Sequence, residues 1–481
     1  MSEYRRQHWV MIFFGVAKQL KEFIVPLLII FLIALFGGDA NGMGTFFYVF
    51  SLGAVGLSFI GGILSWIFFR YRYDAHTLEI RSGVFIKKRR TITRARVQTI
   101  NIQSNIIQRM FGLLSVHIET AGGFSEPELN IKAVPKEEAH YLKQAFYDGV
   151  LDNEESDYDG ASQFETLFQL DEQTLFLAGL TSGGIGLVFS VIAAVASQLW
   201  IFLPETMFTA IRDSFFAATI VTIFFVVAVL VFVSWILSTV RYVLQYGRFT
   251  LKISDEKLHI TRGFLVQKQL TLARDRIQAI RFVEGLLRQP FGYGSVILEV
   301  AGAGGYESNH QTVIHPFIKR DAFQDFIASF ASEYHTECNL ESVPKRAKKR
   351  YLIRASLIFL PLIALGFINS AFWWGFVLWP LSLAFGFLRY KEAASCIDES
   401  QMTLRFRLVA KTTVFMKKPH IQSLTITQNP VQRWRKLASV QATVFSAPSS
   451  QTFTVKDHEL STALERYAWL PPQARVKTNI S

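Results

Sequence analysis

The sequence predicts a multi-pass α-helical membrane protein with about six membrane-spanning helices in three pairs and three small α+β domains. Three observations support this prediction: long apolar runs without charge, one residue pattern that recurs along the chain, and basic residues gathered at one end of the apolar runs. Each domain is expected to be an antiparallel sheet, or a partly open barrel, that ends in one capping helix.

The apolar runs supply the predicted helices. Of the 481 residues, 50% are hydrophobic, and a helix needs about 20 apolar residues to cross a bilayer core. The runs are 23–36, 46–69, 175–203, 215–240 and 355–388. The first of them is the shortest, and the segment 9–16 before it is expected to lie in the membrane interface. Asn369 and Ser370 near the middle of the last run predict two short helices joined by a turn, which brings the total to six.

Basic residues flank one side of each predicted pair. The net charge is +12, yet the expected outer loops 37–45, 204–214 and 369–370 hold a single basic residue, Arg212. The opposite flanks hold Arg5, Arg6, Arg70, Arg72, Arg241, Arg248, Lys345, Arg346, Lys348, Lys349, Arg350, Arg354, Arg389 and Lys391. Because basic loops stay in the cytoplasm, both termini and all three domains are predicted to be cytoplasmic.

Several functional classes are disfavoured. The two cysteines, Cys338 and Cys396, form no C-x-x-C, which predicts neither a disulfide framework nor a thiolate metal site. The ten histidines have no metal-ligand spacing, and no nucleotide loop, nucleophile elbow or paired-carboxylate motif is present. We therefore expect no enzyme activity, no metal and no cofactor. Nucleic acid is an unattractive ligand, since no aromatic residues interleave with the basic ones. The predicted spans contain no ionisable residue, which argues against an ion-coupled transporter.

An internal repeat defines the domains. Fifteen residues recur at a constant offset of 180, and a more divergent third copy follows the first by 324. The first set is Leu78, Ile80, Gly83, Thr91, Arg94, Arg96, Gln98, Ile100, Phe111, Gly112, Ser115, Val116, Glu119, Ala121 and Gly122. In the third copy Gln422, Gln432, Arg433, Ser439 and Val440 match Gln98, Gln108, Arg109, Ser115 and Val116.

Each copy combines strands with a final helix. Apolar and polar residues alternate at 78–81 and 258–261, and again at 115–119 and 295–299, which predicts half-buried strands. Gly83 and Gly263 mark turns, and Gly122-Gly123 and Gly302 to Gly305 predict further hairpins. The helical faces are Phe323, Phe326, Ile327 and Phe330 in the second copy, Leu142 and Phe146 in the first, and Leu460, Leu464 and Tyr467 in the third.

The expected organisation follows from these patterns. It is an N-terminal segment and helix pair at 1–70, a domain at 71–150, an acidic linker at 151–170, a helix pair at 171–242, a domain at 243–337, a basic linker and helix pair at 338–390, and a divergent domain at 391–481.

This order of elements resembles a pleckstrin-homology (PH)-like domain and, more closely, the bacterial PH type 2 family (bPH2, formerly DUF304), of which the chain would be a three-copy member. The motifs that carry the resemblance are Thr91-x-x-Arg94-x-Arg96-Val97-Gln98, Thr271-x-x-Arg274-x-Arg276-Ile277-Gln278, Gln108-Arg109-x-Phe111-Gly112 and Arg288-Gln289-x-Phe291-Gly292. The third copy departs from them with Lys418-x-His420-Ile421-Gln422. The resemblance implies a bacterial inner-membrane location and this fold, but little about activity.

Two basic elements are candidate ligand sites. If Arg94 and Arg96, or Arg274 and Arg276, lie two apart on a strand, they share one face and could grip a phosphate or a carboxylate. A solvated strand face explains the same pattern and is the favoured reading. The second element, the cluster Lys87, Lys88, Arg89 and Arg90, would attract an anionic leaflet by about 1 kcal/mol per residue.

Small residues at helical spacing predict close helix crossings. Ala54, Ser58 and Gly62 form one such row, and Gly179 and Gly183 form another. Crossing within the chain and crossing between chains both remain open.

The sequence thus predicts a non-enzymatic, membrane-anchored binding or scaffold protein. Its cytoplasmic domains would bind a protein, a peptide or anionic lipids of the inner leaflet, in envelope maintenance or stress. Another bPH2 membrane protein is one candidate partner. The alternative is an accessory subunit of a membrane transport or export complex. The oligomeric state stays open.

Overall fold

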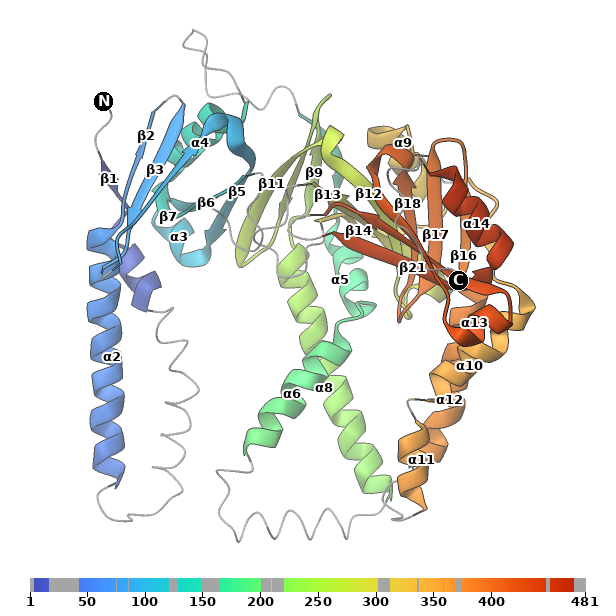
Figure 1. Ribbon diagram of the computed structural model, residues 1–481. Helices are drawn as coiled ribbons and strands as arrows, with labels where there is room; N and C mark the ends of the chain where they lie inside the picture. Colours follow the sequence, from blue (N-terminus) through green and yellow to red (C-terminus); the bar gives the residue numbers. More distant parts are fainter. Residues whose placement is uncertain are drawn as a thin grey trace. The chain divides into compact units, whose positions relative to one another are not determined.

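The computed structural model describes residues 4–16, 43–74, 76–84, 86–120, 129–148, 164–199, 209, 220–301, 312–334, 337–357, 359–367, 374–446 and 450–470. These residues fold into two compact units, which are considered separately (Figure 1). Unit 1 comprises 1–123, 127–252 and 259–271, and unit 2 comprises 124–126, 253–258 and 272–481. The acidic linker at 152–159, the glycine hairpins at 122–123 and 302–305, the run 23–36 and the turn at 369–370 lie outside the described residues.

Unit 1 contains two antiparallel sheets. Their strand orders are β1-β2-β3-β4 and β7-β6-β5-β11-β10-β9-β8. The strands are β1 (Arg5–Arg6), β2 (Arg70–Tyr73), β3 (Thr77–Ser82), β4 (Lys88–Thr93), β5 (Val97–Asn105), β6 (Leu113–Thr120), β7 (Leu129–Pro135), β8 (Glu165–Gln169), β9 (Thr250–Ile253), β10 (Lys257–Arg262) and β11 (Val266–Ala273). The predicted strands at 78–81, 115–119 and 258–261 are confirmed as parts of β3, β6 and β10.

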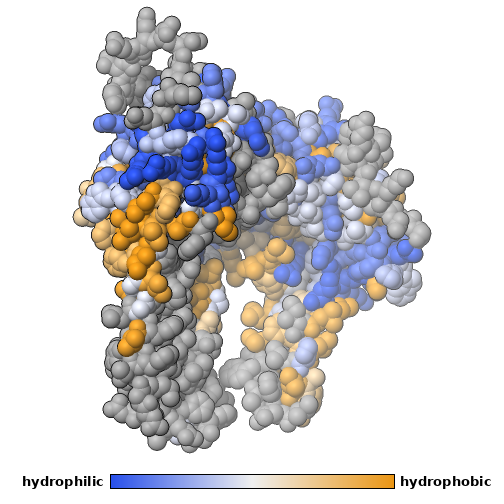
Figure 2. Space-filling view, turned by 60° about the vertical axis from the view of Figure 1, so that its left-hand side comes forward, coloured by the Kyte–Doolittle hydropathy of each residue, from blue (hydrophilic) through white to orange (hydrophobic). Residues whose placement is uncertain are grey.

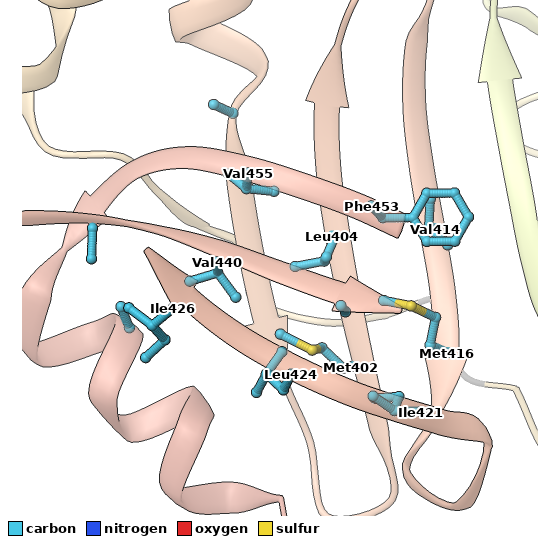
Figure 3. Close-up of a cluster of buried hydrophobic side chains, with 14 of the residues drawn as sticks. Met402, Leu404, Val414, Met416, Ile421, Leu424, Ile426, Val440, Phe453 and Val455 are labelled. Atoms are coloured by element: carbon cyan, nitrogen blue, oxygen red, sulfur yellow. The ribbon is translucent and has the colours of Figure 1, made fainter. Parts of the chain in front are cut away.

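Unit 2 also contains two antiparallel sheets. Their orders are β14-β13-β12-β18-β17-β16-β15 and β19-β20-β21. The strands are β12 (Ile277–Glu284), β13 (Tyr293–Val300), β14 (Thr312–Lys319), β15 (Glu341–Ser342), β16 (Ala394–Ile397), β17 (Gln401–Arg407), β18 (Lys411–Lys417), β19 (Ile421–Thr427), β20 (Leu437–Val444) and β21 (Gln451–Glu459). Apolar side chains of β17 and β18 meet those of β19 to β21 in one buried core, in which Leu404, Leu424 and Val440 are inaccessible to solvent (Figure 3).

The described helices of each repeat are inserted between the first two strands of its sheet. The chain runs from β1 through α2 (Met43–Phe68) to β2, and β1 pairs with β2. It runs likewise from β8 through α5 (Glu172–Leu180), α6 (Ile185–Leu199) and α8 (Ile220–Tyr246) to β9, and from β15 through α10 (Lys348–Ser356), α11 (Leu360–Gly366) and α12 (Trp374–Glu392) to β16. The helices are therefore joined to a sheet at both ends.

The prediction of about six membrane-spanning helices was wrong. Among the described residues one helix, Phe224–Tyr246, is long and apolar enough to span a bilayer. The number is two if Glu172–Leu180 and Ile185–Ile192, which are bent by 59° at a break, count as one span. Hydropathy counts residues but does not detect such breaks. In the third pair α11 has seven residues and α12 contains Pro380, so neither forms a long uninterrupted apolar rod.

Strand pairing joins successive repeats. In unit 1, β11 of the second repeat pairs with β5 of the first, and Lys268 lies opposite Gln103. In unit 2, β18 of the third repeat pairs with β12 of the second, and Thr412 lies opposite Val283. Val283 follows Gln103 by 180 residues and Thr412 follows Lys268 by 144, which are the repeat offsets. The two junctions therefore have the same register.

Capping helices end the three repeats: α4 (Lys136–Lys143), α9 (Phe323–Ala331) and α14 (Leu460–Trp469). Burial of Leu142, Phe146, Phe323, Ile327 and Phe330 confirms the predicted faces of the first two. The predicted face of α14 was wrong in part. Leu464 is exposed, whereas Ala463 and Arg466 are buried. Arg466 reaches inward because Ser395 and Glu341 accept hydrogen bonds from its guanidinium.

Glycines are required at the hairpin turns and at the helix crossings. Gly83 and Gly263 have φ of +104° and +106°, and a Cβ would lie 1.9 Å from the Ile86 oxygen or 2.1 Å from the Val266 oxygen. A Cβ on Gly62 would lie 2.9 Å from Val16, and one on Gly179 would lie 3.1 Å from Thr239. Gly62 and Gly179 thus pack within the chain, whereas no atom of the described residues lies within 4 Å of a Cβ added to Gly183.

The two cysteines are paired. Cys338 and Cys396 form a disulfide with a Cα–Cα distance of 6.3 Å, within the usual range. The expectation of no disulfide was wrong, because β15 and β16 bring residues 58 apart in sequence side by side.

Candidate functional site

The predicted basic cluster lies at the start of β4, the outer strand of the first sheet. Lys87, Lys88, Arg89 and Arg90 are all exposed. The Arg89 guanidinium is held by the Glu79 carboxylate, with Nε 2.6 Å from Oε1. In Figure 2 hydrophilic residues gather over the first repeat, and hydrophobic residues begin below them, where α2 leaves the sheet. Basic side chains of β4 therefore lie at the edge of a sheet that is joined to the apolar helix α2.

Glu79 is a buried carboxylate surrounded by donors. Besides Arg89, it accepts hydrogen bonds from Tyr4 (2.8 Å), Arg72 (3.0 Å) and Arg81 (2.9 Å). Burial alone would raise the pKa of Glu79, but the hydrogen bonds from Tyr4, Arg81 and Arg89 outweigh burial and lower that pKa to about 2. One carboxylate thus faces three guanidinium groups, which leaves this face of the first sheet positively charged.

The recurrent arginines lie on 3-10 turns, not on strands as predicted. The turns are η1 (Arg94–Arg96), η4 (Arg274–Arg276) and, in the third repeat, η8 (Lys418–His420). Each turn carries the chain from the first sheet of a repeat to the second. The first N–H of each turn donates to an earlier hairpin carbonyl: Arg94 to His76, Arg274 to Glu256 and Lys418 to Ser400. This shared backbone bond gives the motif a structural role, and anion binding by these arginines stays a prediction.

A buried polar contact recurs in each repeat. It joins the recurrent serine to the residue seven positions before it. The Gln108 amide donates to the Ser115 hydroxyl (2.6 Å), and the Gln432 amide donates to the Ser439 hydroxyl (2.8 Å). In the second repeat Arg288 takes the place of the glutamine and donates to Ser295 (2.7 Å). The Gln-Arg and Arg-Gln motifs of the sequence therefore begin with a residue that satisfies buried polar groups.

The third repeat adds a buried carboxylate, Asp457, to this contact. Its side chain is inaccessible to solvent, and it accepts a hydrogen bond from the Gln432 amide (2.8 Å). It also pairs with Arg350 (2.9 Å) and Arg354 of α10. In the sequence, the basic run before the third helix pair served only to assign topology. In the structure two of its arginines also hold α10 against β21. Sequence reasoning missed Asp457, since its neighbours lie about 100 residues away.

Two corresponding loops of every repeat expose large hydrophobic side chains, and we call these side chains the apolar rim. One is the short helix or turn α3 (Ile106–Met110), η5 (Gln289–Phe291) or α13 (Pro430–Trp434), in which Met110, Phe291 and Trp434 are 78%, 70% and 80% exposed. The other is the hairpin before β4, β11 or β18. The rim residues are Ile86, Ile107, Met110, Phe111, Leu265, Leu287, Phe291, Leu408, Val409, Val431 and Trp434.

The apolar rim lies beside the ends of the helix pairs. The rings of Trp9 and Phe111 are 5.7 Å apart. Arg389 at the end of α12 donates to the Leu408 carbonyl (3.1 Å), and the Phe264 N–H donates to the Leu244 carbonyl of α8 (2.9 Å). Exposed apolar groups that recur next to apolar helices mark a surface that meets something other than water.

The buried histidines of the described residues are neutral side chains of the sheets. Burial lowers the pKa of His315 to about 3, and burial with nearby lysines lowers the pKa of His117 to about 3 and of His259 to about 4. Within the described ranges, no group of three or more His, Cys, Asp or Glu side chains could hold a metal ion.

Antiparallel sheets ending in one helix, repeated along a chain with apolar helices, define a membrane protein with PH-like domains. A family model described as bacterial PH domain matches residues 19–149, 175–333 and 355–473, so the chain belongs to that family. The chain is also 30% identical over 480 residues to the UPF0699 transmembrane protein YdbT of Bacillus subtilis (strain 168). The match covers 95% of this chain and 96% of the relative.

Proposed function

We propose that this protein is a membrane-anchored scaffold whose PH-like domains rest on the cytoplasmic leaflet of the bacterial inner membrane. The apolar rim enters the interface of that leaflet. The sheet surfaces away from the rim bind a protein partner. The basic residues beside the predicted spans support the cytoplasmic side.

One observation carries the proposal: exposed hydrophobic residues occur in the same loops of all three repeats, and one position matches in all three. Ile107, Leu287 and Val431 follow one another by 180 and 144 residues, and each is about half exposed. Exposing apolar surface to water costs about 25 cal/mol per Å². Exposed apolar side chains in all three repeats therefore lower the stability of the protein unless the rim contacts something other than water. Aromatic and aliphatic residues beside helix ends are typical of interfacial anchors.

The connections between sheet and helix would fix the domains over the leaflet. Each helix pair leaves and re-enters the same sheet, and in the third repeat Asp457 binds two arginines of α10. A domain held at both ends of a helix pair cannot swing freely away from the bilayer. Such an arrangement suits a scaffold.

The basic cluster would add electrostatic attraction. Ile86 of the rim is followed directly by Lys87 and Lys88, and Arg90 lies two residues further on. Near an anionic surface each such residue contributes about 1 kcal/mol. We assign the exposed residues Lys87, Lys88 and Arg90 to contact with anionic lipid.

Depth-dependent quenching tests the proposal. With Cys338 and Cys396 replaced by Ser, a fluorophore on Trp434→Cys in nanodiscs is expected to be quenched strongly by brominated lipids. The matched control is Thr452→Cys. Thr452 pairs with Thr443, which lies six residues along β20 from Leu437. Position 452 is therefore about 20 Å from the end of β20 that follows α13. Equal quenching at positions 434 and 452 would contradict the proposal.

A second arm of the same experiment tests the basic cluster. A probe at Ile86→Cys is expected to be quenched more in anionic than in neutral nanodiscs. Replacing Lys87, Lys88 and Arg90 by Ala should remove that difference, whereas replacing three other exposed lysines, Lys136, Lys319 and Lys456, should not. A difference that survives the first triple substitution would show that the cluster does not contact lipid.

A further inference from the structure

Two outer strands of the described sheets have complementary places in the repeat pattern. Every junction between repeats joins the first strand of a second sheet, β5 or β12, to the last strand of the next repeat's first sheet, β11 or β18. By the same repeat positions, β4 of the first repeat corresponds to β11 and β18, and β19 of the third corresponds to β5 and β12. Among the described strands, β4 and β19 are the outer strands of their sheets.

We propose that β4 of one copy of this chain pairs antiparallel with β19 of a second copy, in the register of the internal junctions. Strands at a sheet edge offer backbone N–H and C=O groups that another strand can bind. A β4–β19 contact would repeat a junction that the chain already forms twice. The occupant is a second copy because one chain carries both halves of the contact.

The register of the contact can be stated residue by residue. Shifting the pair Lys268–Gln103 by the repeat offsets places Lys88 opposite Thr427, and shifting the pair Thr412–Val283 gives the same result. The other end of the contact places Ile92 opposite Ser423, from the pair Met416–Ala279. Two independent junctions thus define one register.

The charges of the two strands favour this pairing over the alternatives. Six of the ten residues from Lys87 to Arg96 are basic and none is acidic, so two β4 strands would bring like charges together. β19 carries no charged residue. The internal junctions show that a neutral strand accepts a basic one, because Lys268 of β11 lies opposite Gln103 of the uncharged β5.

The contact is heterologous, since two different surfaces meet. A contact of this kind either closes into a ring or extends along the membrane. Both outcomes place many PH-like domains on one patch of leaflet. The inference rests on strand order and register and not on the apolar rim, so it can fail while the proposed function stands.

Disulfide trapping between two tagged copies tests the pairing. Both full-length copies carry Cys338→Ser and Cys396→Ser. One also carries Lys88→Cys and the other Thr427→Cys, so that a new disulfide can form only between chains. After mild oxidation in native membranes we expect a dimer that contains both tags. Replacing Lys88→Cys by Thr91→Cys, three residues away on β4, should abolish that dimer.

Three results would overturn the inference. The first is the absence of a dimer with Lys88→Cys and Thr427→Cys, and the second is an equal yield of dimer with Thr91→Cys. The third comes from a single chain that carries both Lys88→Cys and Thr427→Cys: a disulfide that forms within this chain and not between chains. Charge substitution provides a readout without cysteines. Thr427→Lys places a lysine opposite Lys88 and should lower the mass of the detergent-solubilised assembly to that of one chain, and adding Lys88→Glu should restore the larger mass. A mass unchanged by Thr427→Lys would also contradict the pairing.

Discussion

Replacing Asp457 with Asn is expected to lower the free energy of unfolding of the third repeat by about 3–5 kcal/mol, because two arginines lose their buried counter-charge. Arg350 and Arg354 both bind this carboxylate, and the Arg350 side chain is 11% exposed. Asn is the informative substitution because Asp457 has φ of +61°, a conformation that Asn also tolerates. The backbone is thereby kept and the charge alone is removed.

Thermal unfolding of the purified protein in detergent measures this effect. A loss of that size should lower the unfolding midpoint of the third repeat by roughly 10 °C or more. The matched control is Glu459→Gln on the same strand. Glu459 pairs with Arg346, but both side chains are more than 40% exposed, so the expected loss is about 0–1 kcal/mol. Similar midpoints for the two variants would mean that α10 is not held by a buried ion pair.

Replacing Phe330 with Ala is expected to cost about 3–5 kcal/mol of unfolding free energy in the second repeat, since it deletes a fully buried ring and leaves a cavity. Phe330 is 1% exposed on α9, the capping helix. Denaturant unfolding followed by circular dichroism measures the loss. Phe326 on the same helix is partly exposed, and its ring lies 5.3 Å from Phe330, so Phe326→Ala should cost clearly less. The reverse order would contradict the observed face of α9.

Much of the repeat could be predicted because its signals are local. The alternation at 78–81 and 258–261 follows from the two-residue period of a strand. Burial alternates in this way along β10, whereas in β3 the polar residue Glu79 is buried as well. Gly83 and Gly263 mark hairpins because their positive φ excludes a Cβ. The face of α9 follows from helical spacing. These features depend on residues within one or two turns of one another.

The remaining features depend on contacts that no local pattern reports. β1 and β15 have two residues each, too few to show a period, so the insertion of the helix pairs between strands could not be recognised. The break between α5 and α6 falls at the uncharged residues 181–184, Thr-Ser-Gly-Gly, so a search for long runs without charge counted one long span. On α14, Arg466 is buried because Ser395 and Glu341 receive it. Asp457 is likewise explained by distant arginines.

The candidate site shows the same division. The basic cluster at 87–90 was visible as composition, but the binding of Arg89 by Glu79 required the pairing of β3 with β4. The recurrent arginines were visible as a motif, and their place on 3-10 turns was not. The apolar rim was not predicted, because a hydrophobic residue in the sequence does not by itself show whether its side chain is buried or exposed. A test for exposed apolar positions that recur at the repeat offsets would have found it.

Strand pairing between successive repeats can be tested with a single cross-link. In a chain with Cys338→Ser and Cys396→Ser, Gln103→Cys and Lys268→Cys should form a disulfide within one chain, identified by mass spectrometry of the linked peptides, because these residues lie opposite each other on β5 and β11. Gln103→Cys with Gln267→Cys should not, because neighbouring residues of a strand point to opposite faces. No link between positions 103 and 268, or equal links from 103 to 267 and 268, would contradict the account.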